Sequence, residues 1–180
     1  MNNLVMTFVS LIIVILFCSC SVENNNDISS VINNSTVESV LQIDGVSGTI
    51  KYTVIESKKG YRIGYDADNF EYKSGEKDVF LSKENGSSLE VYLSGGKTVD
   101  NISDEYIDAL KKDGYSVTDP DSIAIGTEFY SSVYIRAEKE GEKKECYFIP
   151  VENECLVMIY DIKGDDGDVL LAMIETLTIK

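Results

Sequence analysis

The sequence predicts an α+β fold, with two helices packed on one face of an antiparallel β-sheet, in a single domain spanning residues 45–180. Short runs in which apolar and polar residues alternate are broken by Gly, Asn and Asp, as half-buried antiparallel strands require. Two other segments carry apolar residues at helical spacing. The chain has 180 residues, which suits one such core.

Three alternating runs come before the first helix and predict strands at 49–55, 61–65 and 88–93. Lys59-Gly60 precedes the second run, and Glu-Asn-Gly-Ser at 84–87 precedes the third. Asn-Gly is a strong hairpin signal because both residues tolerate the left-handed backbone of tight turns. The first half of the domain is therefore predicted to be mostly sheet.

A helix is predicted over residues 102–114. Ser103 is the expected cap, acidic residues follow it, lysines occupy the last turn, and Gly114 suits a left-handed stop. The apolar face that should pack on the sheet comprises Tyr106, Ile107 and Leu110.

The second half repeats the pattern, with strands predicted at 128–138, 145–150 and 155–162. After the acidic segment 164–168, in which an Asp can cap, apolar residues recur at steps of three and four and predict a final helix that also covers the sheet. These residues are Leu170, Leu171, Ile174 and Leu177.

Two cysteines fall in adjacent predicted strands. If their hairpin turns at 152–153, Cys146 lies opposite Ile159 and Cys155 opposite Pro150. The sulfurs would then share a face but stand roughly 13 Å apart, too far to bond. A turn two residues earlier would bring them together as a disulfide. We expect buried free thiols.

Four features spread over most of residues 49–179 point to a known family. They are Gly-Tyr-Arg-Ile-Gly-Tyr-Asp at 60–66 with Phe70, the central helix, Ile-Ala-Ile-Gly at 123–126, and the final order of strand, strand and helix. Together they resemble the PsbP-like family of small exported proteins, which includes many lipoproteins of Gram-positive bacteria. The resemblance implies the fold, and a role as an accessory or assembly subunit.

The amino terminus has the composition of a targeting segment. Residues 4–17 are almost entirely apolar, long enough for the core of a signal peptide but short for a hydrocarbon layer of about 30 Å. Leu-Phe-Cys-Ser-Cys at 16–20 then resembles the lipobox of bacterial lipoproteins. The resemblance implies a signal peptide at 1–19 and a lipid, such as palmitate, on Cys20. The alternative is an uncleaved anchor extending to about Val22.

Residues 20–44 are expected to be the lipidated cysteine and a flexible tether. The stretch 21–36 is rich in Asn and Ser and poor in large apolar residues, so it buries too little surface to offset its ordering entropy. The domain is thus expected at the cell surface, lipid-anchored to the extracytoplasmic face of the cell membrane.

Charge and composition narrow the function further. With 31 acidic against 16 basic residues, the net charge is −15, which repels nucleic acid. Histidine is absent, which removes Ser-His and Cys-His catalytic pairs and the commonest transition-metal ligand. We therefore expect a monomer without cofactor or metal centre, and not an enzyme.

One acidic segment has the spacing with which calcium loops begin. Asp66, Asp68 and Glu71 offer oxygen ligands, but Phe70 occupies the third acidic position and no glycine follows, so an EF-hand is excluded. A turn stabilised by Asp and Asn side chains is the preferred interpretation, and a weak cation site is the alternative.

Four tyrosines fall on predicted strands, where they complete the core or line a binding face. They are Tyr130, Tyr134, Tyr147 and Tyr160. The leading functional hypothesis is a non-catalytic binding or assembly module that contacts a protein, peptide or small ligand. The alternatives are a structural envelope lipoprotein without a discrete ligand and, last, a carboxylate-based enzyme.

Overall fold

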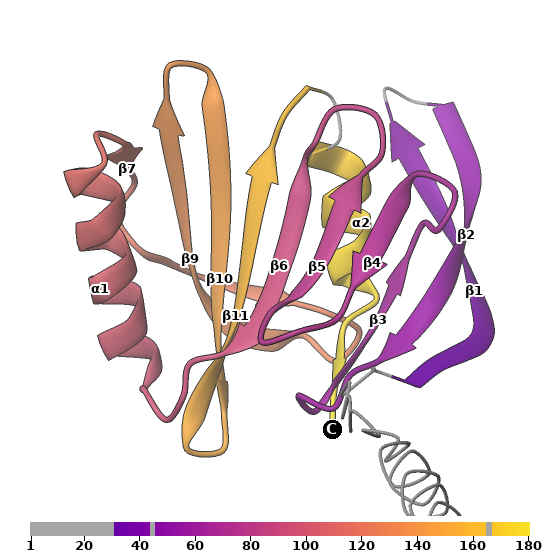
Figure 1. The fold of residues 1–180 in the computed structure, drawn as a ribbon, viewed down its shortest axis with the longest axis horizontal. Helices are drawn as coiled ribbons and strands as arrows, with labels where there is room; N and C mark the ends of the chain where they lie inside the picture. The colour runs from indigo at the N-terminus through magenta and orange to yellow at the C-terminus, as the bar shows by residue number, and fades with distance from the viewer. Residues whose placement is uncertain (1–30, 44–45, 165–166) are drawn as a thin grey trace, which may run out of the picture.

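The computed structural model describes residues 31–43, 46–164 and 167–180, with side chains described from residue 51 onward. The expected signal peptide and Cys20 lie outside these residues. The described chain is α+β, with two antiparallel sheets and two helices (Figure 1). The fold class predicted from the sequence is confirmed at this level.

The smaller sheet has the strand order β1-β2-β3-β12. Its strands are β1 (Val31–Ile43), β2 (Val46–Glu56), β3 (Tyr61–Tyr65) and β12 (Thr178–Ile179).

Strand β1 corrects the expected extent of the tether. Residues 31–43 pair with β2, from Val31 opposite Glu56 to Ile43 opposite Val46, so the folded domain begins well before residue 45. The composition argument treated this segment as if it were isolated. A neighbouring strand supplies the backbone partners that stabilise it, and its Val, Ile and Thr residues favour strand.

The larger sheet has the order β4-β5-β6-β11-β10-β9-β7, with β8 also paired to β9. Its strands are β4 (Phe70–Lys73), β5 (Asp78–Ser82), β6 (Ser88–Leu93), β7 (Ser116–Val117), β8 (Asp121–Ile125), β9 (Tyr130–Lys139), β10 (Glu142–Val151) and β11 (Glu154–Ile162). The sequence predicted β3 and β6 at their observed bounds and β2, β9, β10 and β11 within a few residues. It missed the short strands β4, β5, β7, β8 and β12.

The first helix, α1 (Val99–Lys112), begins earlier than predicted, because Thr98 is its N-cap residue. Ser103 is therefore not the cap. It lies inside the helix, where its hydroxyl donates a hydrogen bond to the Asp100 carbonyl at 3.1 Å. Gly114 has φ +90°, which confirms the predicted left-handed stop.

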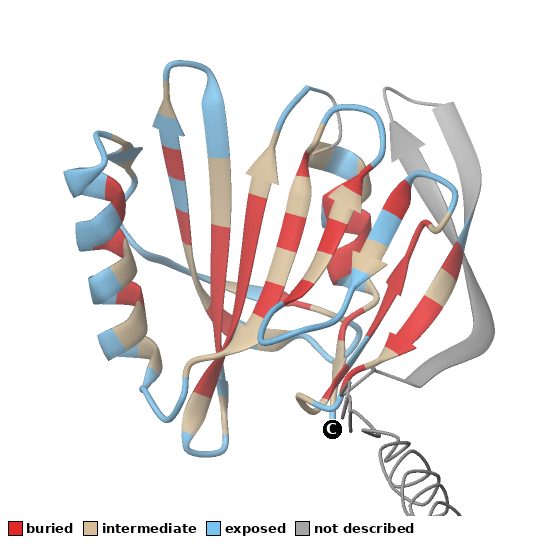
Figure 2. Ribbon diagram, in the orientation of Figure 1, coloured by how far each residue is buried: buried red, intermediate tan, exposed pale blue. Residues whose placement is uncertain are grey.

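The prediction that both helices pack on one face of the sheet is wrong. Helix α1 packs against one face of β10 and β11, where Val157 lies, whereas α2 (Gly167–Glu175) packs on the other, with Met158 (Figures 1 and 2). Successive residues of a strand point to opposite faces. Because β11 is buried on both of its faces, its continuous apolar run is the pattern of a doubly covered strand.

The larger sheet therefore separates two cores. The inter-sheet core lies between the two sheets and includes α2, and its largest fully buried residues are Tyr52, Tyr61, Phe80, Tyr147 and Tyr160. The α1 core lies beneath α1 and includes Ile107, Leu110, Ile135, Phe148 and Val157.

The four strand tyrosines belong to the inter-sheet core. Tyr147 and Tyr160 are buried and meet edge to face with ring centroids 5.8 Å apart, and the Tyr134 ring packs against Tyr147 at a tilt, with centroids 5.0 Å apart. Tyr130 and Tyr134 are half-buried against the same cluster. Of the two alternatives, completion of the core is confirmed.

The predicted hairpin register is also confirmed. Cys146 pairs with Ile159 and Cys155 with Pro150, and both cysteines are free and buried in the α1 core. Burial raises the pKa of each thiol to about 12, so both remain protonated at neutral pH.

Candidate functional site

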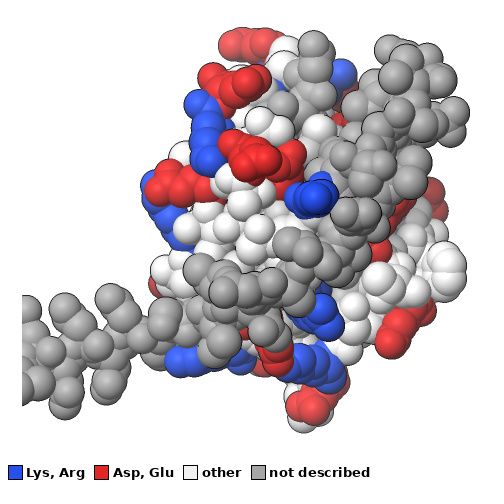
Figure 3. Space-filling model, turned by 90° about the vertical axis from the view of Figure 1, so that its right-hand side faces the viewer, with Lys and Arg blue, Asp and Glu red and all other residues white. Residues whose placement is uncertain are grey.

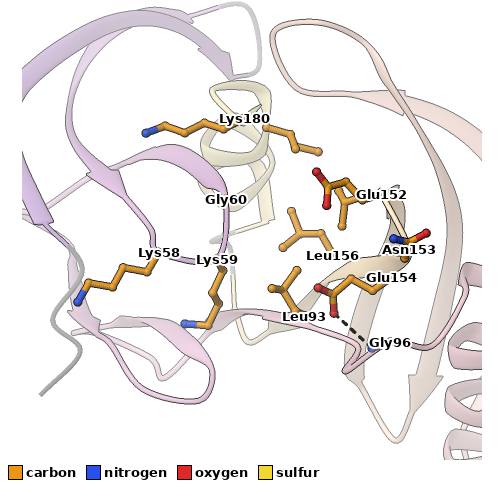
Figure 4. Close-up of a pocket in the computed structure, with 12 residues that line it drawn as sticks. Lys58, Lys59, Gly60, Leu93, Gly96, Glu152, Asn153, Glu154, Leu156 and Lys180 are labelled. Atoms are coloured by element: carbon orange, nitrogen blue, oxygen red, sulfur yellow. Dashed lines mark hydrogen bonds between the residues drawn. The ribbon is translucent and has the colours of Figure 1, made fainter. Parts of the chain in front are cut away.

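A pocket of about 440 Å³ opens at the end of the domain where the two sheets meet, and we call it the seam pocket (Figure 4). Four separate segments contribute to it. They are the β2–β3 turn at 58–60, the end of β6 with the loop to residue 96, the β10–β11 turn with Leu156, and the carboxy terminus at 179–180.

The floor of the seam pocket is apolar. Leu156 is buried, and Leu93, Val151 and Ile179 are half-buried against the inter-sheet core. A ligand surface placed on this floor would be removed from water on one side, at about 25 cal/mol per Å² of apolar area. The floor favours an occupant with an apolar segment.

One wall carries two carboxylates, from Glu152 and Glu154, which both point into the pocket (Figure 4). Glu154 Oε2 accepts the backbone N–H of Gly96 at 3.3 Å. Glu152 is exposed and has φ +46° in the two-residue turn between Val151 and Glu154. A left-handed backbone costs a non-glycine residue on the order of 1 kcal/mol.

The aliphatic parts of three lysine side chains line the side of the pocket opposite the glutamates. The ammonium groups of these lysines point away from the pocket. Lys59 Nζ donates to Asp78 Oδ1 at 2.8 Å, and Lys180 Nζ is bonded to Glu56. Lys58 extends away from the pocket (Figure 4). The charge that faces the pocket is therefore that of the two glutamates.

A buried carboxylate fixes the lysine side of the pocket. Asp78 is fully buried and accepts hydrogen bonds from Ser57 Oγ at 2.7 Å, Tyr61 Oη at 2.5 Å and Lys59 Nζ at 2.8 Å. Two further donors are Tyr72 Oη at 3.3 Å and Ser74 Oγ at 3.1 Å.

Burial acts to raise the pKa of Asp78, but the hydrogen bonds from Lys59, Tyr61 and Ser57 outweigh it and hold the pKa below its ordinary value. The carboxylate is thus ionised at neutral pH, and its acceptor positions are occupied. Because Tyr61 belongs to β3 and Asp78 to β5, this group ties the smaller sheet to the larger one. Its role is structural.

Of the three predicted cation residues, Asp66 and Asp68 belong to the turn between β3 and β4, and Glu71 lies in β4. Asp66 is buried, and its carboxylate accepts the N–H of Asp68 at 3.0 Å and the side-chain amide of Asn69 at 2.8 Å. Glu71 pairs with Lys73 at 3.3 Å. Among the described residues, no three His, Cys, Asp or Glu side chains gather to hold a metal ion. These contacts are those of an Asx turn.

The chain enters the folded domain at the seam-pocket end. Val31, the first residue of β1, pairs with Glu56, and the Glu56 side chain bonds to Lys180 beside the pocket. The start of β1 therefore lies close to the carboxy terminus (Figure 1).

Acidic and basic side chains are interspersed over the described surface of the face seen in Figure 3. The net charge of −15 does not form one continuous acidic area on that face. Charge alone therefore does not mark a partner surface there, and the seam pocket is distinguished by its combination of shape, apolar floor and directed carboxylates.

Sequence reasoning treated Glu152 and Glu154 only as turn residues. The one available signal was the presence of Glu, rather than Gly or Asn, at the first position of a two-residue hairpin turn. The floor residues carried no signal, because the four segments meet only in the folded chain.

No known protein family matches the chain, and no curated protein resembles it significantly. Neither helix in the described part of the chain is both long and apolar enough to cross a bilayer.

Proposed function

We propose that this protein is a lipid-anchored, non-catalytic binding module on the extracytoplasmic face of the cell membrane, with the seam pocket as its ligand site. The observation that carries the proposal is the pocket itself, which joins an apolar floor to two directed carboxylates. The pocket favours a binding module over a structural envelope lipoprotein without a ligand.

The PsbP-like architecture is part of the same proposal. It rests on the resemblance of 60–66 and 123–126 to that family, and it is consistent with an antiparallel sheet that carries helices on both faces. Domains of this kind act as accessory subunits, which favours binding over catalysis.

The arrangement of the carboxylates also favours binding. Acid–base hydrolysis of a glycoside needs two carboxyl groups on opposite sides of the bond that breaks. Glu152 and Glu154 come from one turn and stand on one wall, facing the lysine stems (Figure 4). They are placed to attract one group of a ligand from the same side.

The proposed anchor would hold the pocket close to the membrane. Cys20 lies eleven positions before Val31. A fully extended chain of that length reaches about 40 Å. A ligand presented at the membrane surface would therefore lie within reach of the pocket.

The anchor is tested by labelling cells with palmitate while they express the full chain or its Cys20→Ala form. The expected result is that the label and the membrane fraction are lost in Cys20→Ala and retained in the matched Cys18→Ala control. Labelling of Cys20→Ala at the wild-type level would overturn the lipidation proposal.

A further inference from the structure

The chemistry of the seam pocket points to a class of ligand. Resting on the proposed function, we propose that the pocket binds a primary aliphatic ammonium group, with the alkyl stem on the floor and the ammonium against Glu152 and Glu154.

The apolar floor fits the stem of such a ligand. Leu93, Val151, Leu156 and Ile179 supply hydrocarbon surface from four strands, and the volume of about 440 Å³ accommodates a chain of four or five carbons. Each buried methylene group contributes about a fourfold gain in affinity, the equivalent of about 0.8 kcal/mol. The stem is thus the main source of affinity.

The two carboxylates select the charge. Among the residues with described side chains, no Lys or Arg forms an ion pair with Glu152 or Glu154, and Glu154 uses one oxygen for a long hydrogen bond to Gly96. A cation at the end of the stem would gain charge-assisted hydrogen bonds from both side chains. A carboxylate at the same place would be repelled.

The lysines do not reverse this preference. Lys59 is held in a largely buried pair with Asp78, its side chain 16% exposed, and breaking that pair would strand a buried charge. Lys180 is paired with Glu56, and Lys58 points outward. An anionic ligand would have to recruit these groups away from their present partners or positions.

The test is an NMR titration of the processed chain, residues 20–180 with Cys20→Ala, against pentylamine, pentanol and pentanoate. These probes share a five-carbon stem and differ in charge. The expected result is that pentylamine shifts the amide signals of Gly60, Gly96 and Asn153 saturably and binds more tightly than pentanol, while pentanoate binds most weakly.

The glutamates are tested by Glu152→Gln and Glu154→Gln, with Glu140→Gln as the matched control in a turn outside the pocket. We expect the Kd for pentylamine to rise about threefold in each pocket variant and about tenfold in the double variant, and to stay unchanged in the control. We expect the variants to fold, because Glu152 is exposed and Glu154 is half-buried. Well-dispersed amide signals in their NMR spectra would verify this.

Two results would distinguish failure of the ammonium assignment from failure of the seam pocket as a binding site. If pentanoate or pentanol binds as tightly as pentylamine, or if the double variant keeps its affinity, the ammonium assignment is overturned while the pocket survives as a site. If none of the three probes shifts the pocket amides, both the ligand class and the seam pocket as the binding site are wrong.

The source of the ammonium group is resolved with Nα-acetyl-lysine methylamide, which presents the same stem from a peptide backbone. Tighter binding of this blocked lysine than of pentylamine would identify a lysine side chain of a partner protein. Tighter binding of pentylamine would identify a free amine. Either outcome supports the ammonium assignment, and failure of both compounds to bind would overturn it.

Discussion

The two faces of the larger sheet are built differently from the same strands. One face of β10 and β11 meets α2 and the smaller sheet in the inter-sheet core (Figure 1). This core contains a cluster of aromatic rings in tilted and edge-to-face contact, and one of its members, Tyr61, donates a hydrogen bond to the buried carboxylate of Asp78. The other face meets one helix in the α1 core, which contains apolar side chains and two thiols and is surrounded by half-buried hydrophobic side chains.

The difference lies in how each face is closed. The α1 core is closed by a helix that follows β6 directly in the chain. The inter-sheet core depends on contacts between distant residues, such as the Gly64 N–H that donates to Thr176 Oγ1 at 2.7 Å. The seam pocket opens at the edge of the inter-sheet core, so stability and the candidate site depend on the same face.

The largest effect is expected for Asp78→Ala. The substitution leaves Lys59, Tyr61 and Ser57 without their shared acceptor in a buried position. Removing one partner of a buried ion pair costs about 3–5 kcal/mol. Urea unfolding of the processed chain measures the loss, and a loss below about 1 kcal/mol would show that the Asp78 carboxylate contributes little to holding the two sheets together.

A smaller effect separates the two cores directly. Met173 in the inter-sheet core is fully buried, whereas Leu110 in the α1 core is 5% exposed. Truncation to Ala costs about 2–5 kcal/mol in cores, and more where the surroundings cannot relax. We expect both substitutions to cost less than Asp78→Ala, and Met173→Ala to cost more than Leu110→Ala. The reverse order in urea unfolding would break the comparison.

We also expect Asp78, on the inter-sheet side, to contribute to the pH dependence of stability. The pKa of Asp78 is lower in the folded protein than its value of about 3.9 in the unfolded chain. Its contribution to the free energy of unfolding is therefore complete at pH values above the unfolded pKa. The contribution is lost as the pH falls through the folded pKa. Unfolding free energies measured from pH 6 down to pH 2 should show this loss, and Asp78→Asn should remove it. An unchanged slope in Asp78→Asn would assign the acid sensitivity to other carboxyl groups.

What the sequence predicted well was local. The bounds of β3 and β6 followed from alternation between turn residues, and the register of Cys146 opposite Ile159 followed from a two-residue turn. What it predicted wrongly depended on distant partners. The pairing of β1 with β2 shortened the expected tether, and the position of the smaller sheet determined the face that α2 covers.

The candidate site was beyond sequence reasoning for the same reason. The Asp66 segment was interpreted mainly as a turn because of its Asp and Asn residues, and the Asp66 carboxylate does accept hydrogen bonds within that turn. Glu152 and Glu154 form part of a candidate site only because folding places Leu93, Leu156 and Ile179 beside them in the same pocket. The lipid on Cys20 stays a prediction.

The smallest effect is expected at the two turns that flank β10. Glu140 and Glu152 both occupy two-residue turns with positive φ, +51° and +46°, but only Glu152 lines the seam pocket. Asn tolerates this conformation better than Glu, so Glu140→Asn and Glu152→Asn should each stabilise the protein by about 0.5–1 kcal/mol. Thermal unfolding measures the gain.

Affinity for pentylamine should then separate the two variants. Glu140→Asn should leave the Kd unchanged, whereas Glu152→Asn should raise it about threefold, because it removes one of the two carboxylates that face the ligand. These results would show that Glu152 lowers the stability of the folded protein through its strained backbone but increases the affinity of the pocket for its ligand. If Glu152→Asn gained stability and kept its affinity, the strain at this turn would have no connection with the ligand.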